Sequence, residues 1–433
     1  MSTPLRIGLA GLGTVGGGVG KQLELERARL SALAGRSIVV TAACARDRTK
    51  ERGFDLSGVE WFDDPVAMAR DAEIDVLVET IGGSDGPAKA AVEAALTAGR
   101  SVVTANKALL AHYGGELAAL AETTGAALNF EAAVAGGIPV IKAMREGLVA
   151  NRIASVTGIL NGTCNYILTE MEATGASFTD VLADAQKLGY AEADPSFDVG
   201  GTDAAHKLAI LASLAYGNKV DFDSVFVEGI ERISADDIRF AAEFGYRIKL
   251  LGTTCLNDAG EVEQRVHPTL VPLSSPLAAV SGVTNAVAVN GSYVGQVVLE
   301  GPGAGEGPTA SAVIADLVDI ARGIRYAPFG VPYSALKSSR PADMSGYEGS
   351  YYLRVKAADR AGSMAEITRA LAEAEVSIER IVQRPDRGRD GQWMPVVMMT
   401  HETKEATMQK ALALLSEHED VVSTPVVIRI EQS

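Results

Sequence analysis

Residues 5–16 read LRIGLAGLGTVG, a short apolar segment that leads directly into a glycine-rich turn. The apolar part predicts a buried strand over residues 5–10, and a helical pattern follows it. Gly11, Gly13 and Gly16 stand in a GxGxxG spacing between the two. Glycines at this place allow a tight turn and a close approach of the backbone to a pyrophosphate, which faces the helix N-terminus. The stretch therefore predicts a dinucleotide-binding turn.

Strand-like and helical segments alternate from this turn to about residue 130. The further strand-like segments are 37–43, 75–80 and 101–104, and the helical segments are 15–33, 87–98 and 108–123. Such alternation is typical of a parallel, doubly wound sheet with helices on both faces. An N-terminal Rossmann domain of α/β class is expected.

The rest of the chain has two further patterns. The middle has helical stretches at 140–146, 179–188, 204–215, 238–250 and 309–322, and strand-like runs at 283–289 and 294–299. From residue 351 the order is strand, helix, strand, strand, helix, strand, at 351–357, 364–375, 377–383, 394–400, 404–417 and 421–430. The middle predicts an α+β domain, and the βαββαβ order predicts a ferredoxin-like module. Residues 326–348, rich in Pro, Ser and Gly, suit a linker between them.

Composition limits the classes of partner. The 433 residues carry a formal charge of −16, which argues against nucleic acid or an anionic membrane as a partner. No apolar stretch has the length of a membrane span, and no export signal is recognised, so a cytoplasmic location is expected. Cys44, Cys164 and Cys255 are widely spaced, which favours reduced thiols over disulfides or a zinc site. The histidines show no ligand spacing and predict no metal.

The end of the second strand bears on the choice of cofactor. An acid at that place favours NAD(H), whereas arginine accepts the 2′-phosphate of NADP(H). Arg46 and Arg48 flank Asp47, so the sequence favours NADP(H) over NAD(H). A solvated surface loop is an almost equally good interpretation of Arg48. Thr80 follows the third strand in a loop of small residues that would approach the nicotinamide half.

Acids and a lysine gather in the stretch 188–207, LGYAEADPSFDVGGTDAAHK, which turns into an apolar helix. Charges beside an apolar helix need partners, and the ammonium of an amino-acid-like substrate would suit the carboxylates. Lys207 is the candidate proton donor. Lys107, at the carboxyl end of a predicted parallel strand, would lie beside the cofactor crevice. A solvated acidic loop remains the alternative for this stretch.

Two glycine-containing turns complete the candidate site. Residues 131–139, EAAVAGGIP, offer one carboxylate and backbone carbonyls that suit a monovalent cation, although a hinge between domains fits the pattern better. Residues 158–166, GILNGTCNY, form a polar turn between apolar flanks. Its amides and hydroxyl could bind a substrate carboxylate.

Taken together, these residues resemble homoserine dehydrogenase in its long form with a C-terminal ACT domain. The matching runs are GLAGLGTVGGGV, TANKALLA, EAAVAGGIPVIK, GILNGTCNYIL, LGYAEADPSFDVGGTDAAHKLAILA and GPGAGEGPTASAV. The resemblance implies NAD(P)H-dependent interconversion of L-aspartate 4-semialdehyde and L-homoserine, on the route to threonine and methionine. It also implies a Rossmann domain over 1–133 completed by about 303–325, a catalytic and dimerisation domain over 134–302, a linker over 326–348 and an ACT domain over 349–433.

The resemblance also implies roles for individual residues. Lys207 matches the proton donor, and Lys107 its companion lysine. The implied substrate-binding residues are Gly162, Thr163, Tyr190, Glu192, Asp198 and Asp203. The implied cofactor-binding residues are Gly11, Gly13, Thr14, Val15, Gly16, Ala45, Arg46, Arg48, Thr80, Lys107, Gly189, Gly303 and Glu306. The implied sodium site is Glu131, Val134, Gly136 and Ile138.

Two departures from the family pattern affect what is expected. Gly200 stands where the family often has an acid, for which a small effect on substrate binding is expected because Asp198 and Asp203 remain. The ACT ligand turn keeps Gly362 but changes the following apolar pair, which bears on whether threonine is the effector.

A homodimer, or a tetramer formed by ACT pairing, is expected. The rival interpretations are a dehydrogenase of another amino-acid-like aldehyde or imine, and a non-catalytic amino-acid sensor.

Overall fold

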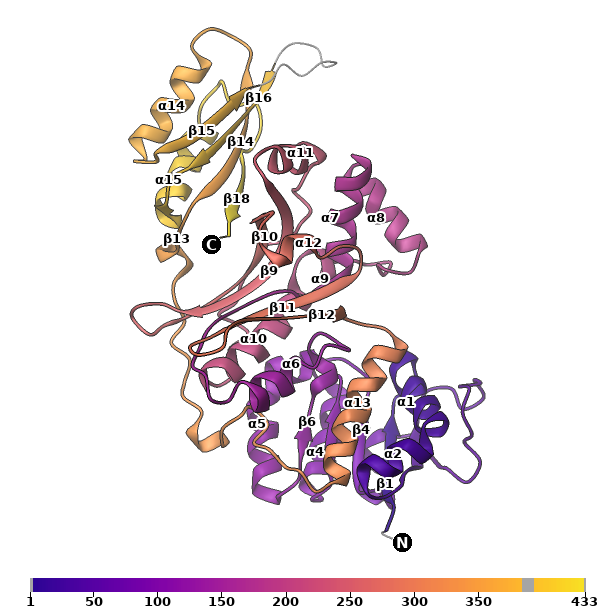
Figure 1. The fold of residues 1–433 in the computed structure, drawn as a ribbon. Coiled ribbons are helices and arrows are strands. Elements are labelled where there is room, and N and C mark those ends of the chain that lie inside the picture. The colour runs from indigo at the N-terminus through magenta and orange to yellow at the C-terminus, as the bar shows by residue number, and fades with distance from the viewer. Residues whose placement is uncertain (1–2, 384–392, 432–433) are drawn as a thin grey trace.

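The computed structural model describes residues 3–383 and 393–431. The first two residues of the predicted Rossmann domain, and residues 384–392 and 432–433 of the predicted ACT domain, lie outside the described residues. Figure 1 shows an N-terminal α/β domain, a central sheet domain, and a C-terminal domain at the opposite end. In the part of the chain that the structure describes, no helix has both the length and the apolar character needed to cross a bilayer.

The N-terminal domain is built on a parallel sheet of six strands in the order β3-β2-β1-β4-β5-β6. The strands are β1 (Leu5–Ala10), β2 (Ile38–Cys44), β3 (Glu60–Phe62), β4 (Val76–Glu79), β5 (Ser101–Thr104) and β6 (Leu128–Asn129). This is the order of a dinucleotide-binding fold, in which ligands lie at the carboxyl ends of the strands near β1 and β4. The predicted doubly wound α/β fold is confirmed.

Helices cover both faces of this sheet because successive strand residues point to opposite sides. On one face lie α1 (Thr14–Leu25), α2 (Arg27–Ala34) and α13 (Glu306–Ala321); on the other lie α3 (Pro65–Asp71), α4 (Gly86–Thr97) and α5 (Lys107–Thr124). Val76 and Val78 of β4 pack into the first layer, and Leu77 packs into the second. Helix α13 comes from a distant part of the sequence and lies against α1 (Figure 1).

The central domain carries a mixed sheet flanked by helices. Its strands are β7 (Ile153–Ile159), β8 (Phe226–Val227), β9 (Tyr246–Leu256), β10 (Val262–Pro272), β11 (Thr284–Gly291) and β12 (Gly295–Pro302). Its helices are α6 (Val140–Lys142), α7 (Gly162–Thr174), α8 (Phe178–Lys187), α9 (Ser196–Val199), α10 (Thr202–Tyr216), α11 (Ala235–Glu243) and α12 (Pro276–Ala279), with one 3-10 turn over Glu131–Ala133 and one π turn over Ala143–Gly147. Helix α10 packs on β7, β9 and β10, which places its N-terminus beside the end of β7.

The C-terminal domain has the predicted βαββαβ order and joins the central sheet. Its main elements are β14 (Tyr351–Ala358), α14 (Ser363–Glu373), β15 (Ile378–Gln383), β16 (Trp393–Thr400), α15 (Glu405–Ser416) and β18 (Val426–Ile430), and β13 (Glu348–Gly349) pairs with β17 (Thr403–Lys404). Strand β18 pairs in parallel with β10, so one ten-stranded sheet crosses both domains. The two 3-10 turns of the connecting segment are Tyr333–Ala335 and Met344–Gly346.

Buried ion pairs reinforce the junction between these two domains. Arg354 of β14 donates to Asp237 of α11, with Nε 2.6 Å from Oδ1. Arg429 of β18 donates to Glu405 of its own domain at 2.8 Å and to Glu228 of the central domain at 2.9 Å. Because each carboxylate offsets the desolvation of the buried guanidinium, removing one partner would leave a buried charge unpaired.

The helix expected over 238–250 is wrong. The helix α11 ends at Glu243, Gly245 has a left-handed φ of +87°, and β9 begins at Tyr246. Glycine adopts this conformation without the steric cost that a Cβ imposes, so the chain reverses and enters the sheet. Pairing with β10 along the whole of β9 then places the apolar run that resembled a helix face in the sheet.

Two other expected boundaries differ from the structure. The single helix expected over 15–33 is two helices, α1 and α2, which meet at Glu26. The last strand begins only at Val426 rather than at residue 421. Pro425 precedes it, and a proline has no N–H to donate to a strand ladder.

Candidate active site

The GxGxxG segment forms the turn from β1 to α1, and close packing excludes side chains from two of its positions. Gly11 has a φ of +95°, and a Cβ there would lie 2.7 Å from the Thr80 carbonyl oxygen. A Cβ at Gly16 would lie 1.9 Å from the Gly11 carbonyl oxygen. Gly13 has open space beside it, and within the described chain no side chain caps α1 and its first turn has no acid. The amides of this helix end are therefore available to an anionic group such as a pyrophosphate.

In the loop after β2, the acidic residue is hydrogen-bonded within the loop, whereas the two arginines are exposed. The carboxylate of Asp47 accepts hydrogen bonds from the backbone N–H and the hydroxyl of Thr49, at 2.8 and 2.7 Å, and these bonds lower its pKa. Arg46 is exposed, and the exposed Arg48 lies over the Trp61 ring at 5.7 Å. The carboxylate of Asp47 is thus bound within its own loop, while Arg46 and Arg48 are exposed residues beside the strand end.

Thr80 and Glu79 fix the loop that follows β4 through their side-chain hydrogen bonds. The Thr80 hydroxyl donates to the Gly11 carbonyl at 2.8 Å, which ties the β4 end to the glycine turn. The buried Glu79 carboxylate accepts from the Ile81 and Gly82 amides and from the Thr104 hydroxyl, at 2.7, 3.0 and 2.6 Å. Thr80 therefore positions the turn through its hydroxyl.

A cavity of about 590 Å³ opens between this sheet edge and the central domain. Its lining includes Thr14, Val15, Lys107, Gly136, Gly162, Thr163, Gly189, Tyr190, Glu192, Asp198, Asp203, Lys207 and Gly303. The structure thus brings both lysines, all six candidate substrate residues and part of the glycine turn to one cavity. Gly11, Gly13, Gly16, Ala45, Arg46, Arg48, Thr80 and Glu306 do not line it and lie on the neighbouring turns and helix ends.

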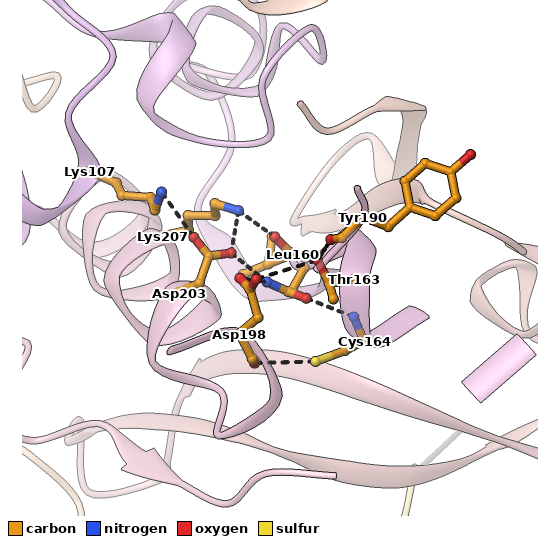
Figure 2. A network of polar contacts seen from close by, with 9 residues as sticks. Lys107, Leu160, Thr163, Cys164, Tyr190, Asp198, Asp203 and Lys207 are labelled. Atoms are coloured by element: carbon orange, nitrogen blue, oxygen red, sulfur yellow. Dashed lines mark hydrogen bonds and ion pairs between the residues drawn. The ribbon is translucent and has the colours of Figure 1, made fainter. Parts of the chain in front are cut away.

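Asp203 lies between the two candidate lysines (Figure 2). The Lys107 ammonium, at the start of α5, is 3.1 Å from Asp203 Oδ1. The Lys207 ammonium, one turn after Asp203 in α10, is 2.7 Å from Oδ2 and donates to the Leu160 carbonyl at 2.6 Å. Lys207 is 8% exposed, so its charge depends on these two partners rather than on water.

Asn161 links the two central carboxylates and is the main residue that sequence reasoning missed. Its Nδ2 donates to Asp198 Oδ1 and to Asp203 Oδ2, both at 2.8 Å, and its Oδ1 accepts the backbone N–H of Cys164 at 2.8 Å. The last bond caps helix α7, so the carboxamide is fixed by the turn that carries it. An asparagine before a helix is a typical N-cap and could have been recognised as one, but its carboxylate partners depend on the position of α10.

The two carboxylates have different proton affinities. Burial opposes ionisation of Asp203, yet Lys207, Lys107 and Asn161 together hold its pKa well below the usual range. The pKa of Asp198 is raised, chiefly by burial, with a smaller contribution from the charge of Asp203. Asp203 therefore stays ionised as the anchor of the lysines, whereas the charge of Asp198 would be stabilised by a cationic ligand group.

The remaining substrate candidates lie at the mouth of the cavity. Thr163 donates its hydroxyl to the Tyr190 carbonyl at 2.7 Å, which holds the 189–192 segment over the cavity. Figure 2 shows the Tyr190 ring directed away from the lysines, and it packs on Tyr166 with ring centroids 4.8 Å apart. The Glu192 side chain is exposed at the rim.

Gly200 stands where the family often has an acid. A Cβ at Gly200 would lie 3.8 Å from Glu231 Oε1, so the Glu231 carboxylate is near the position that this acid would occupy.

The 131–138 turn packs on the segment that returns to α13. A Cβ at Gly136 would lie 2.3 Å from the Gly303 carbonyl oxygen. The Glu131 carboxylate accepts the Ile141 and Lys142 amides, both at 2.9 Å, and burial raises its pKa to about 7. Glu306, at the start of α13, forms an ion pair with Lys21 of α1 at 2.8 Å. The turn and the return segment thus close the cavity together.

The comparisons with known proteins agree along the whole length. Models for "Homoserine dehydrogenase", for "Homoserine dehydrogenase, NAD binding domain" and for "ACT domain" match residues 139–318, 11–131 and 351–420. Homoserine dehydrogenases of Neisseria gonorrhoeae and Pseudomonas aeruginosa are each 46% identical over 435 residues, covering 99% of this chain and 99% of each relative. The chain belongs to the homoserine dehydrogenase family.

Solved structures of the family have the same fold. That of a homoserine dehydrogenase from Thiobacillus denitrificans superposes with a TM-score of 0.92 at 43% identity, covering 99% of both chains. A hyperthermophilic archaeal homoserine dehydrogenase in complex with NADPH gives a TM-score of 0.62 at 28% identity, covering 73% of this chain and 97% of that one. Family membership assigns an oxidoreductase with a nicotinamide-binding domain and an ACT domain, and it disfavours the rival sensor.

Substituting Asn161→Ala should lower kcat/KM for homoserine about ten- to a hundredfold, because two carboxylates lose a shared hydrogen-bond donor. Steady-state oxidation of homoserine measures this, and the Kd of the cofactor should stay unchanged in a fluorescence titration. Asn151→Ala is the matched control, since the Asn151 side chain accepts bonds from Tyr293 and Val294 in a surface loop. A kcat/KM equal to that of the control would contradict the linking role of Asn161.

Proposed function

We propose that this chain catalyses the reversible, NAD(P)H-dependent reduction of L-aspartate 4-semialdehyde to L-homoserine. The observation that carries the proposal is the Lys107–Asp203–Lys207 array in a cavity bordered by the glycine turn. Two cations fixed by one buried carboxylate provide positive charge at a place where negative charge develops during carbonyl reduction. The family match supports the same activity. The pathway position, in threonine and methionine biosynthesis, follows from this reaction.

The cavity offers a complementary group for each charged end of the substrate. Asp198 and Glu192 would hold the substrate ammonium, because both carboxylates line the cavity and neither forms an ion pair with Lys107 or Lys207. The turn that carries Gly162 and Thr163 begins helix α7 and would present backbone amides to the substrate carboxylate. Tyr190 would act through its backbone, which Thr163 holds in place.

Lys207 would move the proton. The nicotinamide, when bound, supplies the hydride that adds to the carbonyl carbon. Lys207 then donates a proton to the carbonyl oxygen, and Asp203 and the Leu160 carbonyl hold its Nζ for that transfer. Lys107 shares Asp203 and would stabilise the negative charge that develops on the same oxygen. In the oxidation direction Lys207 receives the proton from the homoserine hydroxyl.

Lys207→Ala should lower kcat about a hundred- to ten-thousandfold while the Kd of the cofactor changes little, because the proton-transferring group is removed and Lys107 remains paired with Asp203. Absorbance of the reduced nicotinamide, with homoserine and with aspartate semialdehyde, measures turnover, and fluorescence titration measures binding. Lys187→Ala is the control, since Lys187 forms a surface pair with Asp184 on α8. Equal losses of turnover and of cofactor affinity in Lys207→Ala would refute the role. Absence of turnover in the unaltered enzyme would refute the proposed reaction.

NADP(H) is the preferred cofactor in this proposal. The support is the loop after β2, where Asp47 accepts hydrogen bonds from Thr49 and where Arg46 and Arg48 are exposed. The cofactor-binding set proposed is Gly11, Gly13, Thr14, Val15, Gly16, Ala45, Arg46, Arg48, Thr80, Lys107, Gly189, Gly303 and Glu306. Glu306 would contribute by pairing with Lys21 and closing α13 on α1.

Arg46→Ala should lower kcat/KM for NADP⁺ by about tenfold or more and leave kcat/KM for NAD⁺ unchanged, since only NADP⁺ has a 2′-phosphate to lose the charged contact. Steady-state kinetics with both cofactors measure the ratio. Arg29→Ala, which removes an exposed arginine paired with Glu26 on α2, is the control. Equal losses with both cofactors would contradict a 2′-phosphate contact.

A sodium ion at the 131–138 turn is also proposed. The buried carbonyls of Val134 and Gly136 accept no hydrogen bond from any residue in 3–383 or 393–431, and Glu131 adds a carboxylate beside them. Buried carbonyls without donors suit a hard monovalent cation. Ile138 would complete the set, although its carbonyl already accepts the Val140 amide at 2.8 Å. Among the described residues, no cluster of three or more His, Cys, Asp or Glu could hold a metal ion, so the site depends on carbonyls.

Sodium chloride should raise the Tm of the protein above its value in choline chloride at equal ionic strength, because the ion binds only the folded turn. Thermal unfolding at increasing Na⁺ measures this shift, which Glu131→Gln should reduce. Glu116→Gln, at an exposed position on α5, is the control and should keep the full shift. The same Tm in both salts would refute the sodium site.

The ACT domain is proposed to bind an amino-acid effector, with threonine as the candidate. Gly362 has a φ of +102° at the start of α14, and the hydroxyl of Ser363 is buried without a hydrogen-bond partner in the described chain. A buried hydroxyl of this kind is available to a ligand. Kinetics with and without threonine test this assignment.

The enzyme is further proposed to be cytoplasmic and to form a homodimer or a homotetramer. The mass of the enzyme in solution tests the proposed assembly.

A further inference from the structure

We propose that Asn285 is a further binding residue of the active site, whose side-chain carboxamide pairs with the carboxamide of the nicotinamide ring. Asn285 is the second residue of β11 and is 1% exposed. It nevertheless lines the cavity that holds Lys107 and Lys207. The proposal rests on the proposed function, because it assumes that a nicotinamide enters this cavity.

The Asn285 side chain is buried without a partner. Its Oδ1 is buried and accepts no hydrogen bond from the described residues. A buried carboxamide that lacks partners destabilises the folded protein, so a buried asparagine at a cavity wall implies a ligand group that satisfies it.

The carboxamide lies between the two turns that close the cavity. A Cβ at Gly303 would lie 2.2 Å from Asn285 Nδ2, and a Cβ at Gly162 would lie 3.3 Å from Oδ1. Gly162 begins the turn proposed for the substrate, and Gly303 belongs to the return segment proposed for the cofactor. Asn285 therefore stands where the reacting ends of the two ligands would meet, and both glycines leave room for its side chain.

The strand that carries Asn285 is held rigidly. Asn165 of α7 donates to the Thr284 carbonyl at 3.1 Å, one residue before Asn285. The buried Lys249 donates to Asn165 Oδ1 at 3.0 Å and to the Val280 carbonyl at 2.5 Å. Asn285 itself pairs with Gly301 in the β11–β12 ladder. The side chain is thus presented from a fixed backbone, as a positioned binding group requires.

The chemistry of the ligands selects the nicotinamide. The substrate carboxylate only accepts hydrogen bonds, so it would leave Oδ1 without a donor and repel it. The substrate ammonium already has Asp198 and Glu192 as partners in the proposed function, and the reacting carbonyl has the lysines. The nicotinamide carboxamide has an NH2 group that can donate to Oδ1 and a carbonyl oxygen that can accept from Nδ2.

The test compares binding of NADP⁺ with binding of its 3-acetylpyridine analogue, in which a methyl group replaces the carboxamide nitrogen. The unaltered enzyme should bind NADP⁺ about tenfold more tightly than the analogue, the effect of one buried hydrogen bond. In Asn285→Ala the ratio of the two Kd values should fall towards one. Asn285→Asp, which keeps the acceptor oxygen and the side-chain size, should retain most of the preference.

Asn290→Ala is the matched control, because Asn290 lies on the same strand and donates to Ser155 at 2.8 Å. It should keep the full preference of the unaltered enzyme. An unchanged ratio of the two Kd values in Asn285→Ala would overturn the proposal. A higher KM for homoserine with both Kd values unchanged would also overturn it, because Asn285 would then bind the substrate. The Kd values are measured without substrate, whereas the proposed reaction is judged separately by homoserine oxidation in the unaltered enzyme.

Discussion

The ion pairs of Asp203 with two lysines are the interaction on which the rest of the active site depends. Asp203 is 4% exposed, and its charge is compatible with burial only because Lys107 and Lys207 lie at 3.1 and 2.7 Å. The two lysines belong to different domains, so the pair also fixes the Rossmann domain against the central domain. A buried carboxylate left without these cations would be strongly destabilising, which ties the geometry of the site to the stability of the fold.

The same site is connected to the C-terminal domain through one sheet. Strand β7 ends just before Leu160 and Asn161, which contact Lys207 and the carboxylates. That strand lies next to β9, then β10, then β18 of the ACT module. Because the strands share hydrogen bonds and the ion pair of Arg429 with Glu228 crosses the junction, the ACT module and the candidate active site belong to one continuous structural unit.

Much of the fold could be predicted from local patterns. The strand–glycine turn–helix of residues 5–16 and the βαββαβ order from residue 351 were recognised because periodicity and glycine spacing are local properties. The error at residues 238–250 arose because an apolar run there fits a helix face as well as a strand buried on both sides. Only the pairing of β9 with β10, which starts at Tyr246, decides between them.

For the site, the sequence by itself determined which chemical groups are present: a glycine-rich turn before a helix, two lysines and a run of acids. Tertiary structure alone decided how they are paired. Asp203 contacts both lysines, Asn161 bridges Asp198 and Asp203, and the unpartnered Asn285 lies at the cavity wall. Residue type is encoded locally, but a hydrogen bond or an ion pair requires contact. Apart from the Asp203–Lys207 pair, which lies within one turn of α10, these contacts join segments more than 30 residues apart, and only the packing of α10 and β11 on their neighbours brings those segments together.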